Sequence, residues 1–274
     1  MSVKNLFLKL ESYLVKLKLN YNELAGFLTR DERDFFTIRE IERVIKNRAK
    51  HPSITAIYRV KNGAQYIELS IMSVAPICSE IIVIDNGSTD GTLEIVERMK
   101  YELGELCDIK IFNYDSPVAL AGNGYHEEVT KHPERSLAKY YNYSFSLASS
   151  EYLMKCDAHY IYTPAGISRI QSRLIQTYQT NKVIVFRGIE IFGSLLACEP
   201  YLIKKGCFEY HDAEMFEVLK LKFKRSLKHR LLGRISSPCF IHVKRLSYVK
   251  SVFKKGITPV EYLYKTGGRK QNEC

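Results

Sequence analysis

The 274-residue sequence has no long hydrophobic run, and this absence limits where the chain can reside. Uncharged stretches, such as residues 70–79 and 183–186, are much shorter than the roughly 20 apolar residues that span a bilayer. Lysines interrupt the opening residues MSVKNLFLKLESYLVKLKL, which therefore lack the continuous apolar segment and small-residue cleavage site of a signal peptide. We expect a cytoplasmic protein.

Paired cysteines are also missing. The seven cysteines form no CxxC motif, and their odd number in a chain of this size argues against both a disulfide framework and a zinc knuckle. We therefore expect reduced thiols. The sequence contains no internal repeat and no low-complexity tract, so we expect a globular α/β chain and not a repeat array or a disordered segment.

Acidic residues are scarcer than basic ones, 30 against 41, and the excess is uneven. The stretch from Lys220 to Arg234, KLKFKRSLKHRLLGR, contains no acid and could bind nucleic acid, anionic lipid or a phosphorylated ligand. Apolar residues recur there at helical spacing, which predicts a cationic amphipathic helix over residues 215–232. Such a helix suits either contact with an anionic membrane surface or simple packing on the core. The apolar positions are Met215, Val218, Leu219, Phe223, Leu227, Leu231 and Leu232.

Helical segments are predicted before His51, where we place a boundary that sets off residues 1–51 as an N-terminal helical extension. From residue 53 strands alternate with helices at short spacing, which predicts a mostly parallel sheet with helices on both faces. Residues 115–135 show no clear period and are expected to form a long loop. The predicted strands are 54–60, 80–85, 107–114, 151–157 and 182–188, and the predicted helices are 64–74, 91–103, 136–148 and 164–179.

Two of these strands end in polar residues, where open parallel sheets bind their ligands. Asp85 ends the strand EIIVID, and although Asn86-Gly87 is also a hairpin dipeptide, the helical period after Gly91 argues against a returning strand. Asp157 ends the strand EYLMKCD, with His159 two residues on, so the two side chains can converge on one Mn2+ or Mg2+ ion. Alternatively, Asp157 caps the next helix and His159 is an ordinary surface residue.

The segments ITAIYRVKNGAQYIELSIMSV, EIIVIDNGSTDGT and SLAKYYNYSFSLASSEYLMKCDAHYIYTP together resemble the nucleotide-binding half of family 2 glycosyltransferases, which have the GT-A fold. The resemblance covers residues 53–190, implies a nucleotide-sugar-binding region at 52–190, and leaves 191–274 as an acceptor-binding and basic C-terminal region. It implies that Asp85 and Asn86 bind the base and ribose, together with backbone near Tyr58, Arg59 and Lys61. The metal motif of the family, Asp-x-Asp, reads Asp157-Ala158-His159 here.

The resemblance further implies a general base on a loop and helix start after the metal motif, and FEYHDAEMFEV supplies Asp212, with Glu214 as the alternative. Both acids could equally be first-turn residues of a helix, where its dipole favours them. In SPCFIHVKRL, His242 would complete the metal shell, and Lys244 would offset phosphate charge on the leaving group. A buried core histidine is the other interpretation of His242.

These expectations describe an inverting, metal-dependent transfer from a nucleotide-sugar donor, a UDP-sugar, to a saccharide or lipid-linked acceptor in surface polysaccharide or lipopolysaccharide synthesis. They include peripheral contact with the inner face of the plasma membrane and no nucleic-acid partner. One alternative is a sugar-phosphate nucleotidyltransferase, which needs a glycine-rich loop after the first strand, where RVKNGAQY has a single glycine. The other is a basic nucleic-acid-binding protein, whose affinity would fall steeply with salt.

Overall fold

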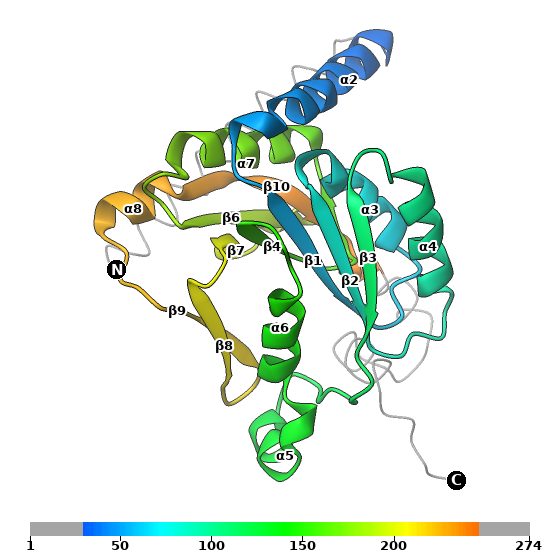
Figure 1. The fold of residues 1–274 in the computed structure, drawn as a ribbon, viewed down its shortest axis with the longest axis vertical. Coiled ribbons are helices and arrows are strands. Elements are labelled where there is room, and N and C mark those ends of the chain that lie inside the picture. Colours follow the sequence, from blue (N-terminus) through cyan, green and yellow to red (C-terminus); the bar gives the residue numbers. More distant parts are fainter. Residues whose placement is uncertain (1–29, 247–274) are drawn as a thin grey trace.

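The computed structural model describes residues 30–246, and its centre is a curled, mostly parallel sheet with helices on both faces (Figure 1). The sheet has eight strands in the order β3-β2-β1-β4-β7-β6-β10-β5. Strands β7 and β5 run antiparallel to their neighbours, and the other pairings are parallel. The strands are β1 (Ile54–Val60), β2 (Glu80–Asp85), β3 (Asp108–Asn113), β4 (Tyr152–Cys156), β5 (Tyr160–Tyr162), β6 (Val183–Glu190), β7 (Glu199–Lys204) and β10 (Arg234–His242).

Alternation of side chains along these strands builds two apolar clusters, one on each face of the sheet. In β2, Ile81 and Val83 belong to the first cluster, and Ile82 and Ile84 to the second. All six residues of β2 are buried, as expected for a central parallel strand covered on both sides.

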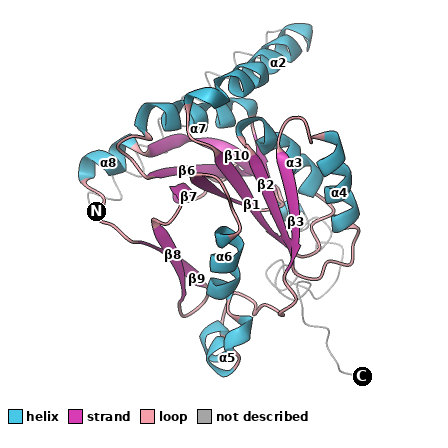
Figure 2. Ribbon diagram, viewed as in Figure 1, coloured by secondary structure: helices cyan, strands magenta, loops and turns pink. Residues whose placement is uncertain are grey.

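The helices divide between these faces (Figure 2). Residues of α3 and α7 pack into the first cluster together with Val96 and Met99 of α4, whereas α6 packs into the second. The helices are α2 (Arg30–Lys46), α3 (Ile67–Val74), α4 (Thr92–Glu102), α5 (Tyr125–Lys131), α6 (Leu137–Ser146), α7 (Pro164–Thr177) and α8 (Leu227–Leu232). None of the helices between residues 30 and 246 combines the length and apolar character needed to cross a bilayer.

The α2 helix lies against α7 and is tied to it by polar contacts as well as by its buried Val44. Arg43 Nη2 donates to Ser168 Oγ at 2.7 Å, and Gln171 Nε2 donates to the carbonyl of Val44 at 2.8 Å. Ile38 and Ile45 of the same helix are exposed.

The helix predicted over residues 215–232 is wrong. Residues 208–221 form a two-stranded antiparallel hairpin of β8 (Phe208–Asp212) and β9 (Glu217–Leu221), and only Leu227–Leu232 are helical, as α8. Leu219, Leu221 and Phe223 pack on the second cluster, where α6 also lies. An apolar surface made by residues distant in sequence stabilises the strand, which outweighs the local helical spacing.

The structure also decides two predictions about loops. The segment 115–135 is not a continuous loop, because it contains α5 and a short 3-10 turn at Pro133–Arg135. The hairpin alternative for Asn86-Gly87 is excluded, because β2 pairs in parallel with β1 and β3 and the chain continues into α4. Gly87 and Gly91 adopt positive φ angles of 73° and 86°, which glycine tolerates best.

Candidate active site

The carboxyl end of β2 presents a buried carboxylate with one unused oxygen. Asp85 is 4 % exposed, and its Oδ2 accepts from the backbone N–H groups of Gly87 and Ser88 at 3.0 and 2.9 Å. Its Oδ1 is buried without a hydrogen-bond partner among the described residues. Leaving such an atom unpaired is costly, so this oxygen is available to a ligand that donates a hydrogen bond.

Asn86 has a structural task, and its predicted contact with the base and ribose stays a prediction. Its Nδ2 donates to the carbonyls of Tyr114 and Ser116, each at 2.8 Å, and it is only 8 % exposed. The amide thereby holds the loop that follows β3 against the end of β2. A carboxylate cannot donate to two carbonyls, which explains why an amide is required in this structure.

The rest of the DNGSTDGT motif braces the loop after β1. Asn62, whose φ is 58°, accepts from the backbone N–H of Thr89 at 2.8 Å and donates its own backbone N–H to Ser88 Oγ at 2.8 Å. Gly63 N donates to Thr92 Oγ1 at 2.9 Å, and Ala64 N donates to Asp90 Oδ2 at 3.0 Å. These side chains fix the two loops relative to each other.

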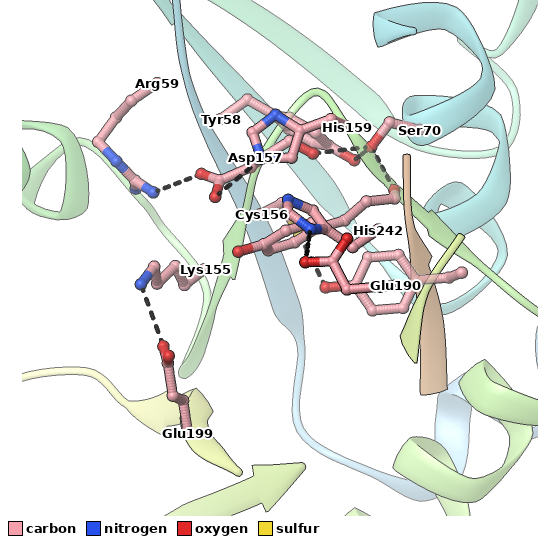
Figure 3. A network of polar contacts seen from close by, with 12 residues as sticks. Tyr58, Arg59, Ser70, Lys155, Cys156, Asp157, His159, Glu190, Glu199 and His242 are labelled. Carbon is pink, nitrogen blue, oxygen red and sulfur yellow. Dashed lines mark hydrogen bonds and ion pairs between the residues drawn. The ribbon is translucent and has the colours of Figure 1, made fainter. Parts of the chain in front are cut away.

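Arg59 lies on the second face of the sheet, because it follows Ile57 by two residues along β1. Its side chain is 3 % exposed, and its Nη2 lies 3.4 Å from Asp157 Oδ1 (Figure 3). Its guanidinium stacks 3.9 Å from the ring centre of Tyr141. Nε and Nη1 are buried without a hydrogen-bond partner within the described part of the chain. A buried cation with unused donors suits an anionic ligand group. By contrast, the side chain of Tyr58 faces the core and hydrogen-bonds Ser70 at 3.0 Å, and Lys61 is exposed.

Asp157 and His159 occupy the turn between β4 and β5 and face each other. The carboxylate Oδ2 and the His159 Nε2 are 3.8 Å apart (Figure 3). Burial opposes ionisation of Asp157, but His159, Arg59 and Lys155 outweigh burial and hold its pKa well below the usual range. Burial lowers the pKa of His159 to about 3, against the opposing effect of Asp157. At neutral pH the pair is a carboxylate beside a neutral imidazole, which is the ionisation state that binds metal ions.

The predicted third ligand, His242, also reaches this site. Its ring centre lies 4.8 Å from that of His159, and its Nδ1 is 2.9 Å from Glu190 Oε1. Lys244, which lies in the 3-10 turn Lys244–Leu246, acts electrostatically on His159. The structure therefore gathers Asp157, His159, His242 and Lys244 at one edge of the sheet.

The fit of a divalent cation can be tested on these side chains. Over residues 30–246, no three His, Cys, Asp or Glu side chains are arranged to hold a metal ion by themselves. Asp157 and His159 offer one carboxylate and one neutral imidazole. Mg2+ is often bound by one or two protein carboxylates completed by water and substrate phosphates, and imidazole suits Mn2+. Asp157 and His159 therefore fit a divalent ion whose coordination shell is completed by a bound ligand.

The predicted bases, Asp212 and Glu214, lie in a β-hairpin. The prediction of a loop followed by the start of a helix is wrong here. Asp212 ends β8 and accepts from Tyr125 Oη, from Ser136 Oγ at 2.6 Å and from Ala138 N at 3.1 Å. Burial alone would raise the pKa of Asp212. The hydrogen bonds from Ser136 and Tyr125 lower this pKa by more than burial raises it, so the net shift is downward. Glu214 is exposed in the hairpin turn.

Sequence reasoning missed Glu217, the first residue of β9. It lines a pocket of about 380 Å3 with Lys155 of β4 and Glu199 of β7. Burial raises the pKa of Glu217, in contrast to that of Asp212. Tyr141 interacts electrostatically with both Glu217 and Asp157, so the pocket adjoins the Arg59–Asp157 pair. No local sequence signal marks Glu217, because its surroundings come from three separate strands and α6.

The sheet, its covering helices and the acidic strand ends define a GT-A-like α/β fold. The model of the family described as "Glycosyl transferase family 2" matches residues 55–229, more than half of the chain. The protein belongs to glycosyltransferase family 2 and is a glycosyltransferase.

Several solved structures are similar to the chain at low sequence identity. The structure of S. aureus TarS 1-349 is 12 % identical, with 76 % of this chain and 68 % of that chain covered and a TM-score of 0.46. M. tuberculosis glucosyl-3-phosphoglycerate synthase is 17 % identical, with 55 % of this chain and 48 % of that chain covered and a TM-score of 0.37. The same enzyme in complex with Mn2+, UDP-glucose and glycerol 3-phosphate is 16 % identical, with the same coverage and a TM-score of 0.36. The match thus spans about half the length of the M. tuberculosis enzyme. No curated protein sequence matches the chain.

Proposed function

We propose that the enzyme transfers a sugar from a nucleotide-sugar donor, a UDP-sugar, to a saccharide or lipid-linked saccharide acceptor with inversion at the anomeric carbon. The unpaired Oδ1 of Asp85 carries this proposal. It lies at the end of β2, where the family binds its nucleotide, and a carboxylate there accepts hydrogen bonds from a base N–H or from ribose hydroxyls. Asn86 supports the pocket by holding the loop after β3.

The diphosphate would lie beside the Asp157–His159 pair, near Arg59. Nε and Nη1 of Arg59 have no hydrogen-bond partner among the described residues, and Lys155 and Lys244 add positive charge. Asp157 and His159 would hold a Mn2+ or Mg2+ ion, with His242 beside them. A bound cation would offset the charge that develops on the departing diphosphate.

For the general base we propose Glu217, in place of the expected Asp212 or Glu214. A base needs an available lone pair and a pKa near the working pH. The hydrogen bonds to Asp212 engage both of its oxygens and its pKa is lowered, whereas Glu217 lines the pocket beside Lys155 and its pKa is raised. Asp212 would instead position the hairpin that presents Glu217. In the reaction, Glu217 takes the proton of the acceptor hydroxyl as that oxygen attacks the anomeric carbon and the bond to the diphosphate breaks.

A lipid-linked acceptor would bring the enzyme to the inner face of the plasma membrane. The support for this is α8, where Leu227, Leu231 and Leu232 are 73 %, 55 % and 39 % exposed beside Lys228 and Arg230. Apolar side chains flanked by cations suit an anionic headgroup surface. The acceptor would then belong to surface polysaccharide or lipopolysaccharide synthesis. Family membership favours sugar transfer over the nucleotidyl-transfer and nucleic-acid-binding alternatives.

The decisive experiment is hydrolysis and transfer from a panel of nucleotide sugars, with Mn2+, with Mg2+ and with EDTA. We expect a UDP-sugar to turn over fastest, EDTA to abolish turnover, and Asp157→Ala to reduce it by at least about 100-fold. Asp108→Ala, an exposed acid at the start of β3, is the matched control and should leave turnover unchanged. Full turnover by Asp157→Ala would exclude the metal assignment. Absence of turnover with every nucleotide sugar would exclude the proposed donor class.

A further inference from the structure

A second pocket, of about 540 Å3, lies between α2, α7 and the first half of β10. It shares no residue with the donor site or with the pocket of Glu217. Its lining residues are Arg43, Ser168, Arg169, Ser172, Arg173, Gln176, Arg234, Ile235, Ser236 and Ser237.

The composition of this lining is unusual. It contains four arginines and four serines, and none of the described residues that line it is acidic. Guanidinium groups present several N–H donors in a planar fork that matches phosphate oxygens, and hydroxyl groups add further donors. Four cations around one concavity repel one another, so the arrangement favours an anionic ligand.

Contacts with the backbone hold two of the four arginines in place. Arg169 Nη1 donates to the carbonyl of Pro238 at 3.0 Å, and Arg173 Nη1 donates to the carbonyl of Leu232 at 2.6 Å. These contacts engage one nitrogen of each guanidinium, and both side chains are only half-buried. Arg43 contacts Glu40 at 2.6 Å, so its charge is partly offset, while its bond to Ser168 orients it toward α7. The donors are therefore positioned before any ligand binds, which reduces the entropy cost of binding.

An irregularity in β10 contributes the serines. The register between β10 and β6 shifts between Arg234 and Pro238, within which Ser236 and Ser237 lie. A shift of register redirects side chains that a regular strand would place alternately on the two faces. Here the two consecutive serines both line the pocket.

We propose that this arginine–serine pocket binds a phosphate group, carried either by a small phosphorylated molecule or by an anionic lipid headgroup. It is a site separate from the sugar donor, and its occupancy does not depend on the proposed transfer reaction. The contact between Arg173 and Leu232 places it next to the C-terminal end of α8 and its exposed leucines.

The first test is calorimetric titration of the full chain with inorganic phosphate, at constant ionic strength and without divalent cations. Ser172 is exposed at the pocket, so Ser172→Asp adds a negative charge without disturbing the core, and Ser172→Asn is a neutral control of the same size. We expect Ser172→Asp to weaken binding at least about tenfold and Ser172→Asn to leave it within about twofold. The double variant Arg169→Gln, Arg173→Gln should also lose binding. Arg98→Gln with Lys100→Gln, on α4, removes the same charge elsewhere and should not.

Vesicles distinguish the two sources of phosphate. Co-sedimentation with phosphatidylcholine vesicles that contain phosphatidic acid, lost in Ser172→Asp, would identify a headgroup. Binding of inorganic phosphate alone would identify a soluble ligand. Equal binding by Ser172→Asp and Ser172→Asn, or no binding to phosphate or vesicles by the unmodified chain, would overturn the proposal. Nucleotide-sugar turnover should be the same in both Ser172 variants, so failure here is distinguishable from failure of the proposed transferase reaction.

Discussion

Glu217 and Asp212 belong to the same β-hairpin, yet their surroundings shift their pKa values in opposite directions. Burial raises the pKa of Glu217 against the opposing effects of Lys155 and Tyr141, whereas hydrogen bonds from Ser136 and Tyr125 outweigh burial and lower that of Asp212. Two carboxyl groups with divergent pKa values in one site serve different roles. The first suits proton transfer and the second suits a fixed anionic anchor.

Glu217→Gln should therefore lower kcat by about 100-fold to 10,000-fold with little change in donor KM, because the amide cannot accept the proton. In the unmodified enzyme, kcat should fall at acid pH as Glu217 becomes protonated, with the midpoint above its ordinary pKa of 4.5. Steady-state rates across pH measure both effects. Asp212→Asn should still show this fall of kcat at acid pH. If the fall disappears in Asp212→Asn and persists in Glu217→Gln, then Asp212 is the base.

Asp212→Asn should destabilise the fold at neutral pH by about 1 kcal/mol. Ser136 Oγ and Ala138 N donate to the carboxylate of Asp212, and in the variant an amide group takes the place of that carboxylate. The folded-state pKa of Asp212 lies below the ordinary 3.8, so its charge contributes stability above pH 3.8 that is lost as pH falls through the folded value. The difference between the two proteins in urea unfolding should shrink as the pH is lowered below about 4. A difference that grows on acidification would contradict this role.

Among the helices and strands, the sequence predicts those that are determined by a local pattern of apolar residues. The strand Glu80–Asp85 and the helices near α3, α4, α6 and α7 follow from apolar runs and helical periods. The β8–β9 hairpin does not, because its stability comes from α6 and the second cluster, and its apolar residues also satisfy a helical spacing. Strand β7, which enters the sheet antiparallel between β4 and β6, likewise has no counterpart among the predicted elements.

The approach of α7 to β10 offers a test of packing between elements. Gly166 lies so close to the strand that an added Cβ would collide with the backbone carbonyl of Cys239. Gly166→Ala should therefore destabilise the protein by about 1–3 kcal/mol, since a carbonyl cannot rotate away as a side chain can. Ser172→Ala, at an exposed position of the same helix, is the control and should change the midpoint of urea unfolding little. Equal stability of the two variants would show that α7 shifts freely.

For the whole molecule, alternation of strands and helices predicts the α/β fold and the edge at which ligands bind, because parallel strands share one carboxyl end. It predicts that Asp157 and His159 meet, since they are two residues apart. It cannot predict that Arg59 stacks on Tyr141, that Asn86 bonds the loop after β3, or that Glu217 faces Lys155. Those contacts join residues from different elements, and their partners are determined by packing.

Ligand binding should raise the stability of the whole fold. A nucleotide that binds only the folded protein stabilises it by about 2.7 kcal/mol at 100 times its Kd. UDP with Mn2+ should therefore raise Tm by several degrees, and Asp85→Ala should remove the shift because it removes the unpaired oxygen at the end of β2. Thermal melting with UDP, CDP and GDP compares the bases. A larger shift with GDP would contradict a uridine donor.

The loop braces of the DNGSTDGT motif have a consequence for evolution. Ser88, Asp90 and Thr92 bond the backbone of residues 62–64 in the β1–α3 loop, so selection on them acts through folding. A descendant that lost its donor, or exchanged it for another, would still need these residues to close the two loops. The residues of the motif should therefore be retained even in members of the lineage that have lost the activity. Asp85 serves both purposes, because its Oδ2 holds the turn through the N–H groups of Gly87 and Ser88, and its Oδ1 is the oxygen left for a ligand.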